Sequence, residues 1–393
     1  MTGNYNEEMK MKKNIILSYI LIIFLLSSCE NLILGPDNNK PPKPEKYSSR
    51  FATILDSLRY SFDLPALAGA IVTDTGLTEA GAVGCRRYGG PKNVTINDCF
   101  HLGSCGKSFT SVLIGTLIDE GLLRWNSTLS DIFPEYVNTM RSEYKDATVL
   151  NILSHSAGFM RDPELTLHSV APEEKRKEVV AWALNQAPEQ QRGKFLYSNL
   201  GYIIAGAIAE KITNRTYEDL LMERVIQPLG LSTAGFGTMG TVGKEDQPLQ
   251  HTANHAPVIA EPDAGLDPCY DPAGGLYMSV SDWGKYCQWV LTIEAGHHQD
   301  LLNDNTARML TTPYVAEGGG LYYALGWGVI DQDWAGGKTL QHSGSNSLNY
   351  STVWLASVRH FGIILMTNQG AIGDEWPLGP AFWCLLDYYQ KGD

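Results

Sequence analysis

The chain has 393 residues, of which 44% are hydrophobic and 19% are charged, so it is long and apolar enough to bury a substantial core. Its formal net charge is −13, from 30 basic and 43 acidic residues. Because no dense cluster of lysine or arginine occurs past residue 46, nucleic acid is not an expected partner, and no polybasic patch for anionic lipid is present.

The first 46 residues indicate export and attachment. Three lysines between residues 10 and 13 precede an apolar run, 15–26, that is too short to span a bilayer as a helix. The run ends in Leu26-Ser27-Ser28-Cys29, which resembles the lipobox of bacterial lipoproteins. By that resemblance, residues 1–28 are a signal peptide and Cys29 is lipidated, which would anchor the exported protein to a bacterial cell-envelope membrane. The alternative is an ordinary signal peptide cleaved near an unrelated cysteine. Residues 29–46, polar and rich in proline, are typical of a flexible tether.

A helical pattern begins at Tyr47, and two strand-like runs follow it. The first run, 67–72, is almost entirely apolar, as a strand buried on both faces would be. The second lies around 79–86, and two glycines at 89 and 90 end it. The middle of the chain is helical, because apolar residues recur there at helical spacing. The helices predicted in this part are 104–122, 173–184, 200–212 and 217–226.

Strand-like runs return near the end of the chain, at 325–330, 339–342, 350–356 and 361–367. A final apolar segment, 381–389, is consistent with a closing helix. Strands at both ends with helices between them predict a sheet lobe built from about 47–98 and 240–393. The helical lobe, about 99–239, is inserted between those parts, and together they form one domain, 47–393.

The cysteines other than Cys29 show no CxxC pair and no spacing typical of a disulfide framework or a metal site. We therefore expect mostly buried free thiols, no metal and no other cofactor. The six residues concerned are Cys85, Cys99, Cys105, Cys269, Cys287 and Cys384.

Ser104 and Lys107 stand three residues apart at the start of a strongly apolar predicted helix. Residues at this spacing lie on one helix face, so the hydroxyl and the amine can meet. A serine is a poor nucleophile at neutral pH unless a neighbouring base takes its proton. Placement at a helix start also directs free backbone N–H groups toward developing negative charge. The pair therefore indicates nucleophilic catalysis.

Two further motifs follow in the chain, a Tyr-x-Asn triplet at Tyr197 and Asn199 and a His-x-Gly triplet at His342 and Gly344. The first lies in a turn-like piece before an apolar helix, and the second lies between two strand-like runs. Context separates these copies from others of the same pattern, which lie in polar loops or begin a strand. The rejected copies are at Ser142 and Lys145, at Tyr136 and Asn138, at His101 and at His360.

With these motifs in this order, the chain resembles the class C β-lactamases and penicillin-binding-protein-like serine hydrolases. Four further phrases match that family in order: Leu153-Ser154-His155-Ser156-Ala157-Gly158-Phe159, Pro228-Leu229-Gly230-Leu231, Ala273-Gly274-Gly275-Leu276 and Leu325-Gly326-Trp327-Gly328. The resemblance covers roughly residues 47–389. It implies an α/β (α+β) fold of the β-lactamase/transpeptidase type, with an antiparallel sheet lobe from both chain ends and an inserted helical lobe.

The resemblance also implies roles for individual residues. Ser104 would be the nucleophile, with Lys107 and Tyr197 as proton carriers, either of which remains open as the general base. Asn199 would hold the acyl side chain and the lysine. His342, Ser343 and Gly344 would form the strand edge that faces the substrate. The backbone N–H groups of Ser104 and Ser345 would form the oxyanion hole.

His342 departs from the β-lactamases of this class, which usually carry a lysine at that position. Histidine is mostly neutral at pH 7, so the cleft has one permanent cation fewer. This weakens the expectation of β-lactamase activity and leaves acyl-enzyme chemistry in place. With the unperturbed histidine pKa, any activity that depends on a substrate carboxylate should fall as the pH rises past about 6.5.

The predicted function is hydrolysis of an ester or amide, small molecule or peptide, through an acyl-enzyme on Ser104. If an alcohol or amine replaces water as the acceptor, the same residues make an acyltransferase. A third reading, a non-catalytic binder of cell-wall peptide, would not need Ser104, Lys107 and Tyr197 together. Aromatic residues that could line an acceptor pocket are Tyr322, Tyr323, Trp327 and Trp334, and the sequence leaves the oligomeric state unknown.

Overall fold

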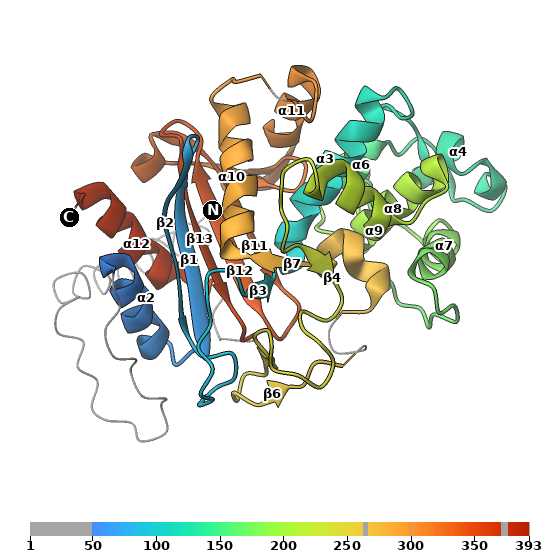
Figure 1. Cartoon of the computed structure of the whole chain (residues 1–393). Coiled ribbons are helices and arrows are strands. Elements are labelled where there is room, and N and C mark those ends of the chain that lie inside the picture. The colour runs from blue at the N-terminus through green and yellow to red at the C-terminus, as the bar shows by residue number, and fades with distance from the viewer. Residues whose placement is uncertain (1–48, 262–265, 299, 371–375, 393) are drawn as a thin grey trace, which may run out of the picture.

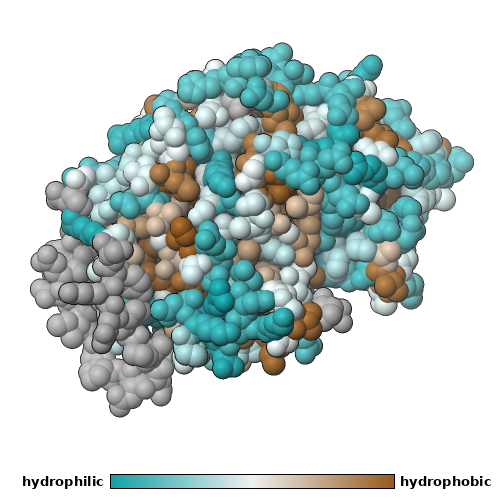
Figure 2. Space-filling view, viewed as in Figure 1, coloured by the Kyte–Doolittle hydropathy of each residue, from teal (hydrophilic) through white to brown (hydrophobic). Residues whose placement is uncertain are grey.

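The structure, a computed structural model, describes residues 49–261, 266–298, 300–370 and 376–392. The predicted signal peptide, the tether and Cys29 lie outside these residues. Within the described ranges, no helix has the length and apolar character needed to cross a membrane. The face shown in Figure 2 is mostly hydrophilic, with hydrophobic residues in several small groups.

An eight-stranded antiparallel sheet forms the first lobe, with strand order β2-β1-β13-β12-β11-β10-β9-β8 (Figure 1). Two of its strands come from the start of the chain and six from the end, which confirms the predicted fold. The strands are β1 (Ala66–Thr73), β2 (Gly76–Gly84), β8 (Val315–Gly318), β9 (Leu321–Tyr323), β10 (Gly328–Gln332), β11 (Gly337–Ser345), β12 (Tyr350–Ala356) and β13 (Phe361–Thr367).

Strand β1 is buried on both faces, as its apolar sequence predicted. Leu67 and Ile71 pack into a core with α2 (Arg50–Ser61) and α12 (Gly379–Lys391), which cover one face of the sheet (Figure 1). The alternate residues, such as Ala68 and Ala70, pack into the main core with α10 (Val280–Glu294) on the other face. Successive side chains of a strand point to opposite faces, which explains this division.

The helical lobe surrounds α3 and α8, both almost wholly buried. Ser198 caps α8 by accepting a hydrogen bond from the backbone N–H of Gly201, and Asn214 ends it in the left-handed conformation. The helices are α3 (Lys107–Asp119), α4 (Leu129–Ile132), α5 (Ser142–Lys145), α6 (Val149–Leu153), α7 (Pro172–Ala183), α8 (Asn199–Thr213) and α9 (Tyr217–Leu221), with the short turns η1 (Gly103–Gly106), η2 (Pro134–Tyr136) and η3 (Met222–Ile226).

The remaining elements connect the two lobes or lie beside them. A small sheet, β3-β7-β4, joins residues from both sides of the predicted lobe boundaries. Helix α11 packs against α3 and α10. These elements are β3 (Cys99–His101), β4 (Gly235–Phe236), β7 (Leu276–Ser279), the pair β5 (Gln250–His251) and β6 (Pro257–Val258), α11 (Asp304–Thr311), and the turns η4 (Pro268–Tyr270), η5 (Asp271–Gly275) and η6 (Asp333–Ala335).

Some predicted boundaries were wrong. The predicted helix 104–122 is a 3₁₀ turn, η1, followed by α3, so Ser104 precedes the α-helix that contains Lys107. The predicted helix 217–226 is divided between α9 and η3. The predicted strand 325–330 begins only at Gly328, in β10. The six described cysteines are unpaired, and four of them are buried.

Candidate active site

Ser104 lies in η1, between strand β3 and helix α3. The turn is entered through Gly103 in the left-handed region, at φ 52°, with its backbone N–H donating to Nδ1 of His101 at 3.2 Å. A Cβ on Gly103 would lie 2.3 Å from the backbone nitrogen of Ser345, so only glycine fits. This close packing fixes the Ser104 backbone against the end of β11.

Lys107 begins α3 one turn after Ser104, and its side chain is fully buried. Its Nζ lies 3.0 Å from Ser104 Oγ, 2.7 Å from Asn199 Oδ1 and 2.6 Å from the carbonyl oxygen of Ala273 in η5. Burial lowers the pKa of Lys107 from its usual value to about 7. Near neutral pH a large fraction of this amine is therefore uncharged.

The three partners of Lys107 suit an uncharged amine, which has two N–H donors and one lone pair. Asn199 Oδ1 and the Ala273 carbonyl oxygen are acceptors only, so they take the two donors. The remaining direction faces Ser104, whose hydroxyl can donate to the lone pair. The arrangement therefore places a base on the candidate nucleophile.

Tyr197 lies beside this pair. Lys107 Nζ is 4.9 Å from the centre of its ring, and the ring of His155 is 4.3 Å from it, centre to centre. Its hydroxyl forms a hydrogen bond with Ser104. Burial raises the pKa of Tyr197 well above its usual value, so the phenol keeps its proton at neutral pH. Tyr197 is thus a proton donor in the resting site.

Asn199 is held at both ends of its amide. Its Oδ1 accepts from Lys107, and its Nδ2 donates to Oδ1 of Asp162 at 2.8 Å. Asp162 follows the phrase 153–159 in the sequence, and sequence analysis did not assign it a role. The Asn199 amide therefore orients Lys107 and connects it to a carboxylate at the edge of the site.

Gly344 in β11 packs against the backbone of η1. A Cβ at this position would lie 2.0 Å from the carbonyl oxygen of Leu102 and 2.6 Å from the nitrogen of Ser104. The close approach that requires glycine here is thus with the protein itself, and the sequence-based reason, approach of a substrate, was wrong. Ser345 turns its side chain into the following turn, where Oγ donates to the Asn349 carbonyl oxygen at 2.7 Å. The backbone of Ser345 remains beside η1, consistent with an oxyanion site.

His342 is buried in β11 with both ring nitrogens engaged. Nδ1 lies 2.8 Å from the carbonyl oxygen of Ser343, so it carries the proton, and Nε2 accepts from the hydroxyl of Tyr323 at 3.0 Å. Burial lowers the pKa of His342 to about 3. The ring is neutral at physiological pH, as expected, but it does not titrate near pH 6.5. That part of the sequence-based expectation was wrong because it used the unperturbed pKa.

The structure brings Ser104, Lys107, Tyr197 and Asn199 together and keeps the rejected motif copies apart from them. Ser142 lies in α5, where its hydroxyl donates to Glu143, and Tyr136 lies in η2. Of the aromatic candidates, Tyr323 reaches the site, whereas Trp334 packs against Phe382 of α12 in the other core. The structure adds Ala273, Asp162, Arg161 and His155 to the candidate site.

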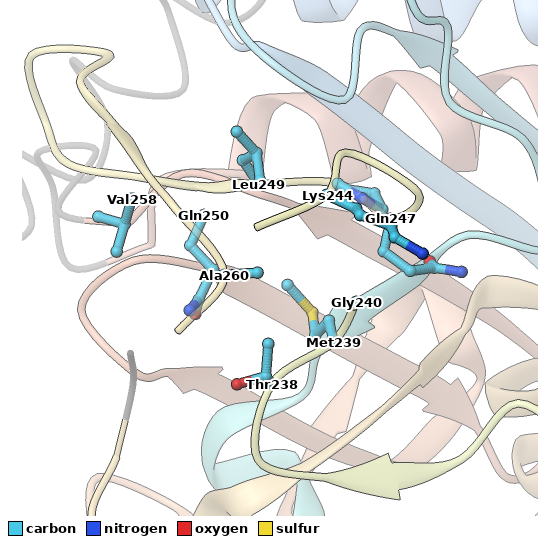
Figure 3. Close-up of a pocket in the computed structure, with 10 residues that line it drawn as sticks. Thr238, Met239, Gly240, Lys244, Gln247, Leu249, Gln250, Val258 and Ala260 are labelled. Atoms are coloured by element: carbon cyan, nitrogen blue, oxygen red, sulfur yellow. The ribbon is translucent and has the colours of Figure 1, made fainter. Parts of the chain in front are cut away.

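Other hollows do not compete with this site. The one shown in Figure 3 is lined by side chains such as Met239, Gln247 and Gln250 and has a volume of about 10 Å³. That is room for about one water molecule. The part of the chain that the structure describes contains no group of three or more His, Cys, Asp or Glu residues able to hold a metal ion.

Comparison with known proteins agrees with this geometry. Residues 51–379 match the family model described as Beta-lactamase. Penicillin-binding protein 4 of Amycolatopsis lactamdurans is 25% identical over 342 residues, which cover 80% of this chain and 84% of that protein. Protein flp of Staphylococcus aureus is 22% identical over 272 residues, 68% of this chain, and this match spans 52% of its length.

Two solved structures share the fold. The octameric penicillin-binding protein homologue from Pyrococcus abyssi has a TM-score of 0.71 at 21% identity, over 87% of this chain and 78% of that one. The D-alanine carboxypeptidase AmpC from Burkholderia cenocepacia has a TM-score of 0.70 at 17% identity, over 86% of this chain and 97% of that one.

Proposed function

Because the chain belongs to the beta-lactamase family, we propose that it is a serine hydrolase that cleaves an ester or amide through an acyl-enzyme on Ser104. One observation carries the proposal. Lys107 Nζ is buried, has two fixed acceptors in Asn199 and Ala273, and faces Ser104 Oγ with its remaining position at 3.0 Å. A serine with a base so placed is an activated nucleophile.

In the proposed mechanism, Lys107 takes the Ser104 proton as Oγ attacks the carbonyl carbon of the substrate. The negative charge that forms on the carbonyl oxygen is stabilised by the backbone N–H groups of Ser104 and Ser345, each contributing on the order of 3 kcal/mol. Tyr197 gives its proton to the leaving group and regains one from Lys107. Water then attacks the ester of Ser104 by the same steps in reverse order.

The substrate class proposed is a simple ester rather than a penicillin or cephalosporin. His342 is neutral, and both of its ring nitrogens are engaged within the protein, so β11 offers no cation to a substrate carboxylate. A charge-assisted hydrogen bond is roughly twice as strong as a neutral one, so its loss weakens binding of a β-lactam carboxylate. The names of the relatives, a penicillin-binding protein and a D-alanine carboxypeptidase, make D-alanyl peptides the next class to assay.

Steady-state hydrolysis of a short-chain nitrophenyl ester, nitrocefin and a D-alanyl-D-alanine peptide tests this function. The ester should give the highest kcat/KM, and Ser104→Ala should abolish its turnover with the fold intact by circular dichroism. Ser142→Ala, the other serine followed by lysine at this spacing, is the matched control and should keep full activity. Turnover that survives Ser104→Ala contradicts the proposal, and strong preference for nitrocefin contradicts the substrate class.

The proposed location is a bacterial cell-envelope membrane, with Cys29 lipidated after removal of residues 1–28. The support is the sequence Leu26-Ser27-Ser28-Cys29 behind a basic and apolar leader. The full-length protein expressed in a bacterium should partition into the detergent phase, and Cys29→Ala should move it to the aqueous phase. Cys85→Ala should leave the partition unchanged. An aqueous wild-type protein with an unmodified mature N-terminus would rule the anchor out.

A further inference from the structure

Arg161 is the exposed cation beside the proton carriers. Its guanidinium carbon lies 5.3 Å from the centre of the Tyr197 ring, and 69% of its side chain is exposed. It is among the charges that act on Lys107, His155 and Tyr197, whereas the charge that acts on His342 is Lys107. Arg161 therefore lies on the helical-lobe side of the site, away from β11.

The backbone that carries Arg161 is attached to the segment that carries Tyr197. The Leu200 N–H donates to the Arg161 carbonyl oxygen at 3.0 Å, and the Ser198 hydroxyl donates to the Met160 carbonyl oxygen at 2.6 Å. Because Ser198 also caps α8, this attachment extends into a buried helix. The guanidinium is thus held near the reacting groups from a fixed base.

The guanidinium keeps part of its hydrogen-bonding capacity. Its Nε lies 3.6 Å from Oδ2 of Asp162, and among the described residues its two terminal nitrogens have no hydrogen-bond partner. Asp162 uses its other oxygen, Oδ1, for Asn199. Two free terminal nitrogens in a planar fork match the geometry of a carboxylate or a similar oxyanion.

We propose that Arg161 binds an anionic group on the acyl part of the substrate, so that the favoured substrates are esters or amides of acids with a second carboxylate or similar anion. This inference rests on the proposed acyl-enzyme at Ser104 and names its substrate class. The acyl part stays in the site through both steps, so one contact assists acylation and deacylation. The neighbouring carboxylate of Asp162 sets the strength of this binding, since it offsets part of the Arg161 charge.

The test compares matched esters that differ by one charge: the 4-nitrophenyl monoester of adipic acid and the same ester with its free carboxylate methylated. The wild type should prefer the anionic ester. Arg161→Gln should lower the ratio of the two kcat/KM values about 10- to 100-fold, mainly through KM, and Arg161→Lys should lower it less. Asp162→Asn, which keeps an acceptor for Asn199, should raise the ratio.

Arg141→Gln is the matched control, because Arg141 is an exposed arginine paired with Glu143 at the edge of α5 and should leave the ratio unchanged. An unchanged ratio in Arg161→Gln, with both esters still hydrolysed, overturns the inference and leaves the function standing. So does a discrimination that follows an anionic leaving group, measured with 4-carboxyphenyl and 4-methoxycarbonylphenyl butyrate. An equal loss on both adipate esters, with a shifted pH profile, would show an effect on the proton carriers and also overturns it. Hydrolysis of neither ester by the wild type would instead count against the proposed function.

Discussion

The hydroxyl of Tyr323 donates to Nε2 of His342 at 3.0 Å, and Nδ1 of the same ring donates to the Ser343 carbonyl oxygen at 2.8 Å. Tyr323 comes from β9 and His342 from β11, so the contact crosses over β10 within the sheet. A ring that is buried and bonded on both sides is locked in its neutral form.

The first prediction concerns pH and His342. Its pKa of about 3 lies below the unperturbed value, so the ring stays neutral as the pH rises through neutrality and contributes no loss of activity there. The ratio of kcat/KM between wild type and His342→Asn should stay constant from about pH 5 to about pH 8. A ratio that falls through about pH 6.5 would show that His342 titrates and binds the substrate as a cation.

The second prediction concerns Lys107. Its pKa is lowered to about 7, so the amine is charged below that pH and becomes a free base above it. The kcat/KM of a neutral ester should therefore rise with pH and level off above about pH 7. Lys107→Ala should reduce kcat/KM by about 10²- to 10⁴-fold. Lys285→Ala, at an exposed lysine of α10, is the control. A flat profile from pH 5 to 9 would remove Lys107 as the base.

The third prediction concerns His155 as a positioning residue for Tyr197. Its Nδ1 accepts from the Ser198 N–H at 3.1 Å, its ring packs 4.3 Å from the Tyr197 ring, and its backbone has φ 59°. Asparagine tolerates this conformation and offers an acceptor, but alanine offers none. We expect kcat to fall by up to about 100-fold in His155→Ala and by less in His155→Asn, with a smaller change in KM.

This order is measured with a nitrophenyl ester at saturating concentration, together with thermal unfolding of each variant. If both variants lost activity only in proportion to the fraction unfolded, His155 would be a packing residue without a role in aligning Tyr197.

The fourth prediction concerns Gly344. Because an added Cβ would lie 2.0 Å from the Leu102 carbonyl oxygen and 2.6 Å from the Ser104 nitrogen, Gly344→Ala must push β11 away from η1. Overpacking of this kind costs about 1–3 kcal/mol of stability. The displacement of Ser104 relative to Ser345 should lower kcat by about 10²-fold or more. Wild-type kcat and melting temperature in this variant would show that the two backbones have room to separate.

The strands and the long helices were accessible from the sequence because their signals are local. Strands β12 and β13 begin and end where the apolar runs 350–356 and 361–367 do. Helix α10 was missed although Trp283, Cys287 and Val290 recur at helical spacing after the cap residue Ser279, so a signal was present. Strands β8 and β9 are three or four residues long and gave none.

The site was accessible only in part for a similar reason. Ser104, Lys107, Tyr197 and Asn199 carry recognisable side chains in a recognisable order. The Ala273 acceptor is a backbone carbonyl, whose role depends on where η5 folds rather than on a side chain. Arg161, Asp162 and Tyr323 reach the site through tertiary contacts that no short spacing encodes. The engaged state of His342 was also hidden, since it depends on burial and on a partner 19 residues away.

The account's central claim is that Ser104 becomes covalently acylated with Lys107 as its base. Intact-protein mass spectrometry tests it most directly, after rapid acid quench of a reaction with an activated ester, followed by peptide mapping of the adduct. The account predicts one acyl group per chain on Ser104, strongly slowed formation in Lys107→Ala, no adduct in Ser104→Ala, and a full adduct in Ser142→Ala. An adduct on any other residue, or turnover by wild type with no adduct and equal adduct formation in Lys107→Ala, would contradict it.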